Sequence, residues 1–156
     1  MSTAGTILEK ALVTWFGSGL LPGAPGTWGS LAALPFAYAL FHLGGPLSLA
    51  VGVVAVSLIG WMVVNAYQER HGLDDPGHIV IDEVAGVWLT LTFAPPTLTA
   101  YALGFALFRL FDIAKPWPVN WADKQVGGGL GVMLDDILAG LYAAAILCLV
   151  QLAGWI

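Results

Sequence analysis

The sequence predicts an all-α protein, a polytopic membrane helix bundle with about five short transmembrane helices plus an N-terminal interfacial helix. Of its 156 residues 58% are hydrophobic and only 10% are charged, which is outside the usual range of soluble domains. The charges form three blocks, Glu9–Lys10, Glu69–Glu83 and Arg109–Asp136, separated by apolar stretches. Two of these stretches contain tight breaks, Gly44-Gly45-Pro46 and Pro95-Pro96, so each can cross a bilayer, turn and return. We therefore expect one membrane domain, residues 1–156, with its polar blocks on one side. An unusually apolar soluble helical core is the alternative.

The chain begins with a segment that fits a helix at the membrane surface. Between residues 3 and 16, apolar side chains recur at helical spacing, with Glu9 and Lys10 on the other side. The segment lacks the basic start and the small-residue cleavage site of a signal peptide, so we expect no processing. Residues 17–30 contain five glycines and two prolines, a composition that favours a loop.

Five apolar segments follow, and we expect each to cross the membrane as a helix. They are residues 31–43, 47–65, 79–94, 97–113 and the tail from about Asp135 onward. A polar connection at residues 68–78 carries the turn residues Asp74-Asp75-Pro76-Gly77, and Pro116-Trp117-Pro118 ends the fourth helix. All five Lys and Arg residues fall on the side of the N-terminus, which the positive-inside rule assigns to the cytoplasm.

Five carboxylates are expected to meet at one depth, from three different helices. Ionised groups inside a membrane cost roughly 2.5–3.5 kcal/mol each at a helix centre, and anions this close together repel one another unless cations join them. Magnesium suits such a site, because it is a hard ion that takes carboxylate and phosphate oxygens. We predict that Mg²⁺ is held by Asp82, Glu83, Asp112, Asp135 and Asp136. The simpler alternative is that Asp82 and Asp135 only cap helix N-termini.

Basic and glycine residues near these carboxylates are candidates for binding a phosphate. Lys115 follows Asp112 by three residues and is either a phosphate ligand or a lysine whose ammonium reaches the lipid headgroups. Arg109 precedes Asp112 by three and can pair with it. The glycine-rich segment, with a helix expected to begin near Thr27, can offer backbone N–H groups to an anion. Its candidate contacts are Gly26, Thr27, Gly29 and Ser30.

The histidines and the single cysteine carry weaker signals. His71 and His78 lie in the polar block and are candidate proton carriers, whereas His42 lies beside the far-side turn and is expected to be structural. Cys148 lies in the last apolar segment, where it is expected to face lipid or to pack. A lone cysteine excludes an intrachain disulfide and a metal site built on thiolates.

Together these features predict metal-assisted hydrolysis of a phosphate carried by a lipid, at the cytoplasmic surface of a membrane. The net charge of −5, with only five Lys and Arg residues, excludes a nucleic-acid partner. The glycine-rich segment has no GKT or GKS sequence, so it is not a nucleotide P-loop. An ion- or proton-coupled transporter is the alternative, since carboxylates within membranes also mark ion paths. The gathering of the carboxylates at one end argues against it, and the oligomeric state stays open.

Five motifs in order resemble the phosphatidylglycerophosphatase A family, over about residues 15–142. They are Phe16-Gly-Ser-Gly-Leu20, Pro25-Gly-Thr-Trp-Gly-Ser-Leu31, Ile81-Asp-Glu-Val-Ala-Gly86, Phe108-Arg-Leu-Phe-Asp-Ile-Ala-Lys-Pro-Trp-Pro118 and Gly131-Val-Met-Leu-Asp-Asp-Ile-Leu-Ala-Gly140. The resemblance implies a bacterial inner-membrane, magnesium-dependent enzyme that hydrolyses phosphatidylglycerophosphate to phosphatidylglycerol and inorganic phosphate. A CDP-alcohol phosphotransferase, the rival lipid enzyme, would need a DGxxAR stretch that this sequence lacks.

Carried over by motif, the resemblance implies roles for the residues singled out above. The five acidic residues form the metal and catalytic set, Lys115 contacts phosphate, and Gly26 to Ser30 form the substrate loop. The predicted catalytic residues are Asp82, Glu83, Asp112, Lys115 and Asp136, and Arg109 joins the predicted substrate contacts. One hypothesis has a hydroxide generated at the metal attack phosphorus directly, and another has an aspartate form a phosphoenzyme. We favour hydroxide, because no DxDx nucleophile motif and no Cys-x5-Arg loop is present.

Overall fold

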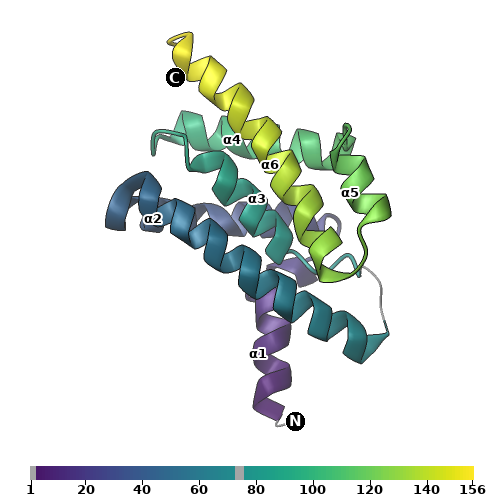
Figure 1. Ribbon diagram of the computed structural model, residues 1–156. Coiled ribbons are helices and arrows are strands. Elements are labelled where there is room, and N and C mark those ends of the chain that lie inside the picture. Colours follow the sequence, from purple (N-terminus) through teal and green to yellow (C-terminus); the bar gives the residue numbers. More distant parts are fainter. Residues whose placement is uncertain (1–2, 73–75) are drawn as a thin grey trace.

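The computed structural model describes residues 3–72 and 76–156, and within those ranges it contains helices and no strand (Figure 1). The all-α prediction is therefore confirmed, whereas the predicted turn residues Asp74 and Asp75 lie outside the described residues. The elements in chain order are α1 (Thr3–Val13), a short 3₁₀ turn (Ser18–Leu20), α2 (Pro25–His71), α3 (Ile81–Leu91), α4 (Leu98–Ala114), α5 (Val119–Gln125) and α6 (Gly128–Leu152).

Helix α1 extends away from the bundle with the N-terminus at its far end (Figure 1). It ends at Val13, because Trp15 and Phe16 have positive φ angles of 43° and 55°, a conformation that stops a helix. Its apolar Ile7 is exposed, whereas Glu9 is buried and forms an ion pair with Arg70 of α2. The interfacial position of this helix, whose Ile7 is exposed, stays a prediction.

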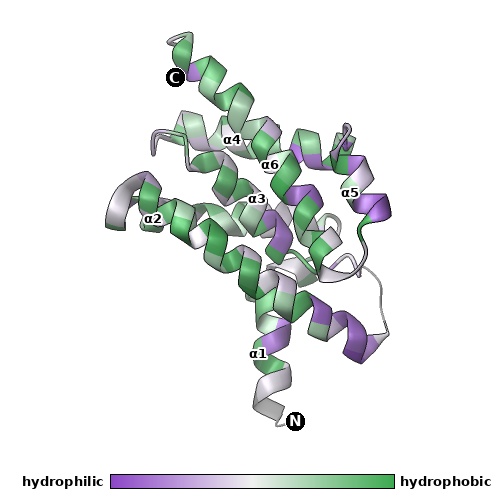
Figure 2. Cartoon of the chain, in the orientation of Figure 1, coloured by the Kyte–Doolittle hydropathy of each residue, from purple (hydrophilic) through white to green (hydrophobic). Residues whose placement is uncertain are grey.

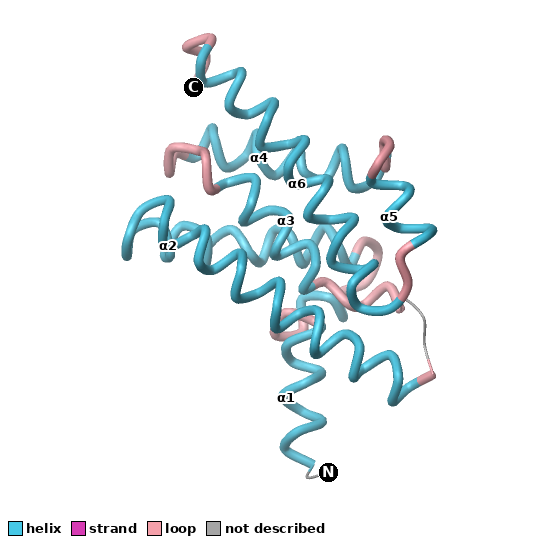
Figure 3. The backbone as a smooth tube through the Cα atoms, viewed as in Figure 1, coloured by secondary structure: helices cyan, strands magenta, loops and turns pink. Residues whose placement is uncertain are grey.

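Helix α2 consists of two arms that are joined by the predicted break at Gly44-Gly45. Gly45 has φ 66° and ψ −155°, which a residue with a side chain rarely adopts, and the chain turns back there (Figure 3). The first arm begins at Pro25 rather than near Thr27, since proline suits the first helical position. The predicted substrate loop at residues 26–30 is thus the opening of a helix. The second arm continues past Asn65 to His71, beyond the predicted end.

Helix α3 is the centre of the bundle and packs against α2 and α6. Most of its side chains are buried, and it touches α6 through two glycines. A Cβ added at Gly140 would lie 2.5 Å from the backbone oxygen of Gly86. The hydroxyl of Thr90 donates to the carbonyl oxygens of Gly86 and Gly140, at 3.0 and 3.2 Å. These small residues allow α3 and α6 to approach through their main chains.

Replacing Gly140 by alanine is expected to destabilise the fold by about 1–3 kcal/mol, because the new methyl group meets backbone atoms that cannot rotate away. The measurement is the denaturation midpoint in detergent. Gly77→Ala is the control, since a Cβ there meets nothing within 4 Å and its φ is not positive. Equal midpoints for the two variants would contradict the close contact of α3 with α6.

The last third of the chain differs from the prediction in two places. Helix α6 begins at Gly128 rather than near Asp135, because the N–H of Gly129 donates to Oδ1 of Asn65 at 2.6 Å and is satisfied within the fold. Asp135 and Asp136 therefore lie inside the helix and do not cap it. The short helix α5 was not predicted, although α4 does end just before Pro116 as expected.

Two helices, α2 and α6, are long and apolar enough to cross a membrane. Helices α3 and α4 have 11 and 17 residues, fewer than the roughly 20 that a full span needs, so the five predicted crossings are not established. Large apolar side chains are widely exposed, and Leu43, Leu98 and Leu152 are each more than 80% exposed. Hydrophilic residues gather at the end of α2, the start of α3 and along α5 (Figure 2). A lipid-exposed bundle with one polar end accounts for both observations.

The candidate proton carriers His71 and His78 gather around Tyr67 at the polar end of α2. The Tyr67 hydroxyl lies 2.8 Å from Nε2 of His78, and Nδ1 of His71 lies 2.9 Å from the Tyr67 carbonyl oxygen. Partial burial lowers the pKa of His78, and the nearby charges of Lys10 and His71 lower it further.

Acidification is expected to destabilise the fold through His78. The unfolded chain, with a histidine pKa of about 6.5, binds a proton more readily than the folded protein does. This contribution to stability is therefore complete above about pH 6.5 and is lost as the pH falls through the lower folded pKa. The test compares melting temperatures at about pH 7.5 and pH 5. His78→Gln should show a smaller fall than the unmodified protein, and an identical fall would contradict the assignment.

Candidate active site

Three carboxylates from two helices converge at the polar end of the bundle. Asp82 and Glu83 lie in the first turn of α3, and Asp136 lies in α6. One oxygen from each falls within 4.8 Å of the others. The start of α3 is held in place because the N–H of Val80 donates to the carbonyl oxygen of Val13 at 2.8 Å. The positive end of the α3 dipole favours acidic residues in this turn.

Two oxygens of this group, one on Glu83 and one on Asp136, lack the partners that buried carboxylates require. Oε2 of Glu83 and Oδ2 of Asp136 are buried and have no hydrogen-bond partner among the described residues. A buried polar atom without a partner costs about 1–3 kcal/mol, and neighbouring anions add repulsion. A divalent cation would remove both costs. The candidate ligands are all carboxylate oxygens, which would fit magnesium better than a softer metal.

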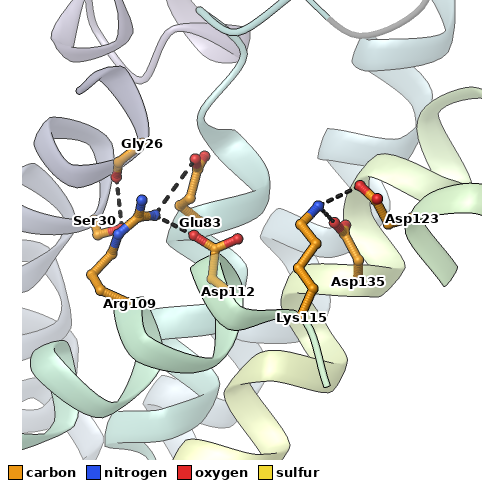
Figure 4. Close-up of polar contacts among 8 residues, drawn as sticks. All are labelled: Gly26, Ser30, Glu83, Arg109, Asp112, Lys115, Asp123 and Asp135. Carbon is orange, nitrogen blue, oxygen red and sulfur yellow. Dashed lines mark hydrogen bonds and ion pairs between the residues drawn. The ribbon is translucent and has the colours of Figure 1, made fainter. Parts of the chain in front are cut away.

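Arg109 and Asp112, both on α4, border this group (Figure 4). Nη1 of Arg109 lies 2.5 Å from Oδ2 of Asp112 and 3.8 Å from Oε1 of Glu83. The predicted pairing of Arg109 with Asp112 is confirmed. Asp112 also interacts electrostatically with Glu83 and Asp136, so the fourth predicted carboxylate belongs to the same charged cluster. Arg109 holds two of its members in position.

Asp135 lies apart from this group and pairs with Lys115 instead. Nζ of Lys115 is 2.8 Å from Oδ2 of Asp135 and also contacts Asp123 of α5 (Figure 4). Lys115 ends α4 in a left-handed conformation, which directs the chain toward α5. Partial burial lowers the pKa of Lys115, but hydrogen bonds and attraction from Asp123 and Asp135 outweigh it, so the net pKa is raised. Lys115 therefore stays charged, and it links α4, α5 and α6.

The glycine-rich opening of α2 reaches the cluster at one point. A Cβ at Gly26 would lie 2.2 Å from Oε1 of Glu83 and 3.0 Å from Nη1 of Arg109, so only a glycine fits without displacing Glu83. Gly29 instead packs against Val80, and the Ser30 hydroxyl donates to the Gly26 carbonyl at 2.7 Å (Figure 4). Thr27 is half-buried on the same helix. Of the four predicted contacts, Gly26 is the one that touches the carboxylate cluster.

Sequence reasoning missed two contributors to this region. Asp123 was not considered, although it lies in the same polar block as its partner Lys115. The junction between α5 and α6, from Gln125 to Gly129, was also not considered. Both depend on α5, whose seven residues give too little helical periodicity to be recognised.

A comparison with protein families gives a match over residues 11–151 to the family described as phosphatidylglycerophosphatase A. The chain belongs to this family. Phosphatidylglycerophosphatase A of Escherichia coli is 44% identical over 87% of this chain and 79% of its own length, and that of Haemophilus influenzae is 38% identical over 90% and 86%. As a member of the phosphatidylglycerophosphatase A family, the chain is a phosphatase.

A third relative carries a different name. A Bacteroides thetaiotaomicron protein, named provisionally as a phosphatidylinositol-3-phosphatase, is 39% identical over 97% of this chain and 96% of its own length. No solved structure matches the chain.

Proposed function

We propose that this protein hydrolyses phosphatidylglycerophosphate to phosphatidylglycerol and inorganic phosphate, with Mg²⁺ as its metal. The substrate follows from the name of the family and of two relatives. The observation that supports the metal is the group formed by Asp82, Glu83 and Asp136, because two of these residues have buried oxygens without a hydrogen-bond partner among the described residues. Such a group favours a cation that would also bind phosphate oxygens.

The proposed reaction needs a water molecule and a bound phosphate monoester. Water attacks phosphorus, the bond between phosphorus and the glycerol oxygen breaks, and that oxygen takes up a proton as the alcohol leaves. Magnesium, when bound, would polarise the phosphoryl oxygens and offset charge on the leaving oxygen. Asp82, Glu83 and Asp136 would hold the metal, with Asp112 as the fourth acid of the cluster. Arg109 keeps Asp112 and Glu83 in place, and Lys115 does the same for Asp135.

A multi-pass arrangement in a bacterial inner membrane, with the site on the cytoplasmic side, completes the proposal. It is supported by the gathering of polar segments at one end of the bundle (Figure 2) and by the positive-inside rule. Single cysteines introduced at Glu69 and Asp112, in a Cys148→Ser background, would test it with an impermeant maleimide. Both should react from the cytoplasmic side alone. Labelling of the Asp112 site from the opposite side would contradict a shared cytoplasmic face.

Phosphatidylinositol 3-phosphate is a second candidate substrate, favoured by the name of the Bacteroides relative. Both lipids carry a phosphate monoester on a polyol that a phosphodiester joins to diacylglycerol. The same carboxylate cluster can therefore bind the phosphate monoester of either lipid. The two substrates would be distinguished by how the protein recognises their polyol.

The decisive experiment measures inorganic phosphate released by purified protein in mixed micelles of each lipid, with Mg²⁺ or with EDTA. We expect hydrolysis of phosphatidylglycerophosphate that EDTA abolishes and Mg²⁺ restores. Full turnover in EDTA would refute the role of the metal. Faster hydrolysis of phosphatidylinositol 3-phosphate would make that lipid the assigned substrate. An aspartate that binds beryllofluoride, as a mimic of a phosphoaspartate, would support a phosphoenzyme route in place of direct attack by water.

A further inference from the structure

A cavity of about 320 Å³ opens beside the carboxylate cluster, at the junction of α5 and α6. The cavity is lined by Asp82 and Asp135 together with residues 123–128, Gly131 and Val132. Because Asp82 belongs both to this cavity and to the candidate metal group, the two spaces adjoin. The volume is about ten times the 30 Å³ that one water molecule occupies in the liquid, so the cavity can hold more than a phosphate group.

The part of the cavity lining at the junction of α5 and α6 is suited to an anion. Gly127 and Gly128 line the cavity at the N-terminus of α6, a helix of 25 residues. The N-cap residue Gly127 has no side chain to cap this end, although Asn65 accepts from the N–H of Gly129. The backbone N–H groups and the positive end of the helix dipole favour a negative charge here. Lys124, on α5, also lines the cavity and adds a positive charge. The carboxylate of Asp123, which lines the cavity too, is paired with Lys115.

The part of the cavity lining formed by Asp135 is suited to a hydroxyl group. Asp135 is only 7% exposed; its Oδ2 accepts from Lys115, but its buried Oδ1 has no partner among the described residues. A carboxylate oxygen in that position needs a donor. Asp135 lines the cavity and lies outside the group of three closest carboxylates. A rotation of its carboxylate would present an oxygen to an alcohol hydroxyl that projects into the cavity.

We propose that this cavity binds the part of the lipid headgroup that is not hydrolysed, with the phosphodiester at the N-terminus of α6 near Lys124 and the glycerol hydroxyl at Asp135. This inference rests on the proposed function, which supplies the headgroup. A lipid with its phosphate monoester at the carboxylate cluster has a three-carbon glycerol and a second phosphate beyond it, and both face the adjoining cavity. Lys124, Gly127 and Asp135 thereby distinguish this headgroup from that of a simple phosphate monoester.

Substitutions at Gly127 separate binding from folding. Its φ is −86° and a Cβ there meets nothing within 4 Å, so a side chain fits. Aspartate and asparagine both favour the N-cap position, but only aspartate puts a negative charge where the phosphodiester would lie. For phosphatidylglycerophosphate, Gly127→Asp should raise KM about tenfold or more and Gly127→Asn less than about threefold, with kcat nearly unchanged. The melting temperature should not fall in either variant.

Lys124 provides a second test with a matched control. Lys124→Gln should raise KM about fivefold or more, whereas Lys10→Gln, which removes the same charge from α1, should leave it unchanged. The non-hydrolysed lipid gives a direct readout: short-chain phosphatidylglycerol, titrated in EDTA, should bind more weakly to Gly127→Asp and Lys124→Gln than to the unmodified protein. Short-chain phosphatidic acid, which lacks the phosphodiester and the headgroup glycerol, should bind all of them alike.

The outcomes separate this inference from the function on which it rests. If the unmodified protein releases no phosphate from phosphatidylglycerophosphate, the proposed function fails. If it is active but Gly127→Asp and Lys124→Gln keep their KM and their affinity for phosphatidylglycerol, the cavity does not bind the headgroup. Equal weakening of phosphatidic acid and phosphatidylglycerol would overturn the proposal too, because the effect would then lie at the phosphate monoester site.

Discussion

Replacing Asp136 by asparagine is expected to lower phosphate release from phosphatidylglycerophosphate at least about 100-fold. Asp136 is 2% exposed, and its carboxylate lies within 4.8 Å of those of Asp82 and Glu83. Asparagine keeps the size of the side chain but replaces two anionic oxygens by one neutral oxygen, which is a weaker ligand for a hard cation. The measurement is the initial rate of phosphate release at saturating Mg²⁺.

Thermal stability gives the Asp136→Asn test a readout that does not depend on activity. Mg²⁺ should raise the melting temperature of the unmodified protein by binding the folded state, and this rise should largely vanish in the variant. In EDTA the variant should be the more stable of the two, because one buried negative charge is gone. Glu69→Gln, which removes an exposed charge on α2, is the control and should behave like the unmodified protein. Equal stabilisation by Mg²⁺ in Asp136→Asn would refute its role as a ligand.

Gly26→Ala is expected to lower activity about 10- to 100-fold with little loss of stability. Its Cβ would lie 2.2 Å from Oε1 of Glu83, and the end of a flexible side chain can move away at a small cost in folding energy. The displaced carboxylate would then lose its place among the metal ligands, so the Mg²⁺ concentration needed for half-maximal rate should rise. Rates measured across a Mg²⁺ titration, together with the melting temperature, test both parts.

A double-mutant cycle makes the Gly26 test specific. Glu83→Asp shortens the side chain that the new methyl group would strike, so Gly26→Ala should cost less activity in a Glu83→Asp background than alone. Gly77→Ala should change neither activity nor stability. Strictly additive effects of the two changes would show that Gly26 does not act through Glu83.

The arrangement of the polar blocks could be predicted because it depends on simple properties of the chain. Apolar runs interrupted by Gly44-Gly45 require a turn, and proline at position 116 requires α4 to end. Together with the break at Pro95-Pro96, which turns the chain between α3 and α4, these constraints bring residues from α3, α4 and α6 to one end. The pairing of Arg109 with Asp112 also follows from helical spacing. Such features are local, so they can be recognised without knowledge of tertiary contacts.

The remaining features depend on contacts between distant segments, which the sequence pattern does not reveal. Helix α6 extends seven residues earlier than predicted because Asn65, far away in the chain, accepts from Gly129. Asp135 separates from Asp136 because Lys115 pairs with it, and adjacent helical residues point about 100° apart. The sequence pattern identified Asp135 and Asp136 as neighbouring acids. It could not show that Asp136 lies in the candidate metal group whereas Asp135 lines the adjoining cavity.

The contact between Gly86 and Gly140 has a mechanical consequence for the catalytic centre. Each glycine follows an acidic residue by four positions, Asp82 in one helix and Asp136 in the other, so the place where the two main chains touch lies one helical turn from the acids. Two helices whose main chains touch at that point cannot approach further or tilt freely when the thickness or the tension of the surrounding bilayer changes. The distance between the two acids should thus be insensitive to acyl-chain length, and the enzyme should work in bilayers of very different composition.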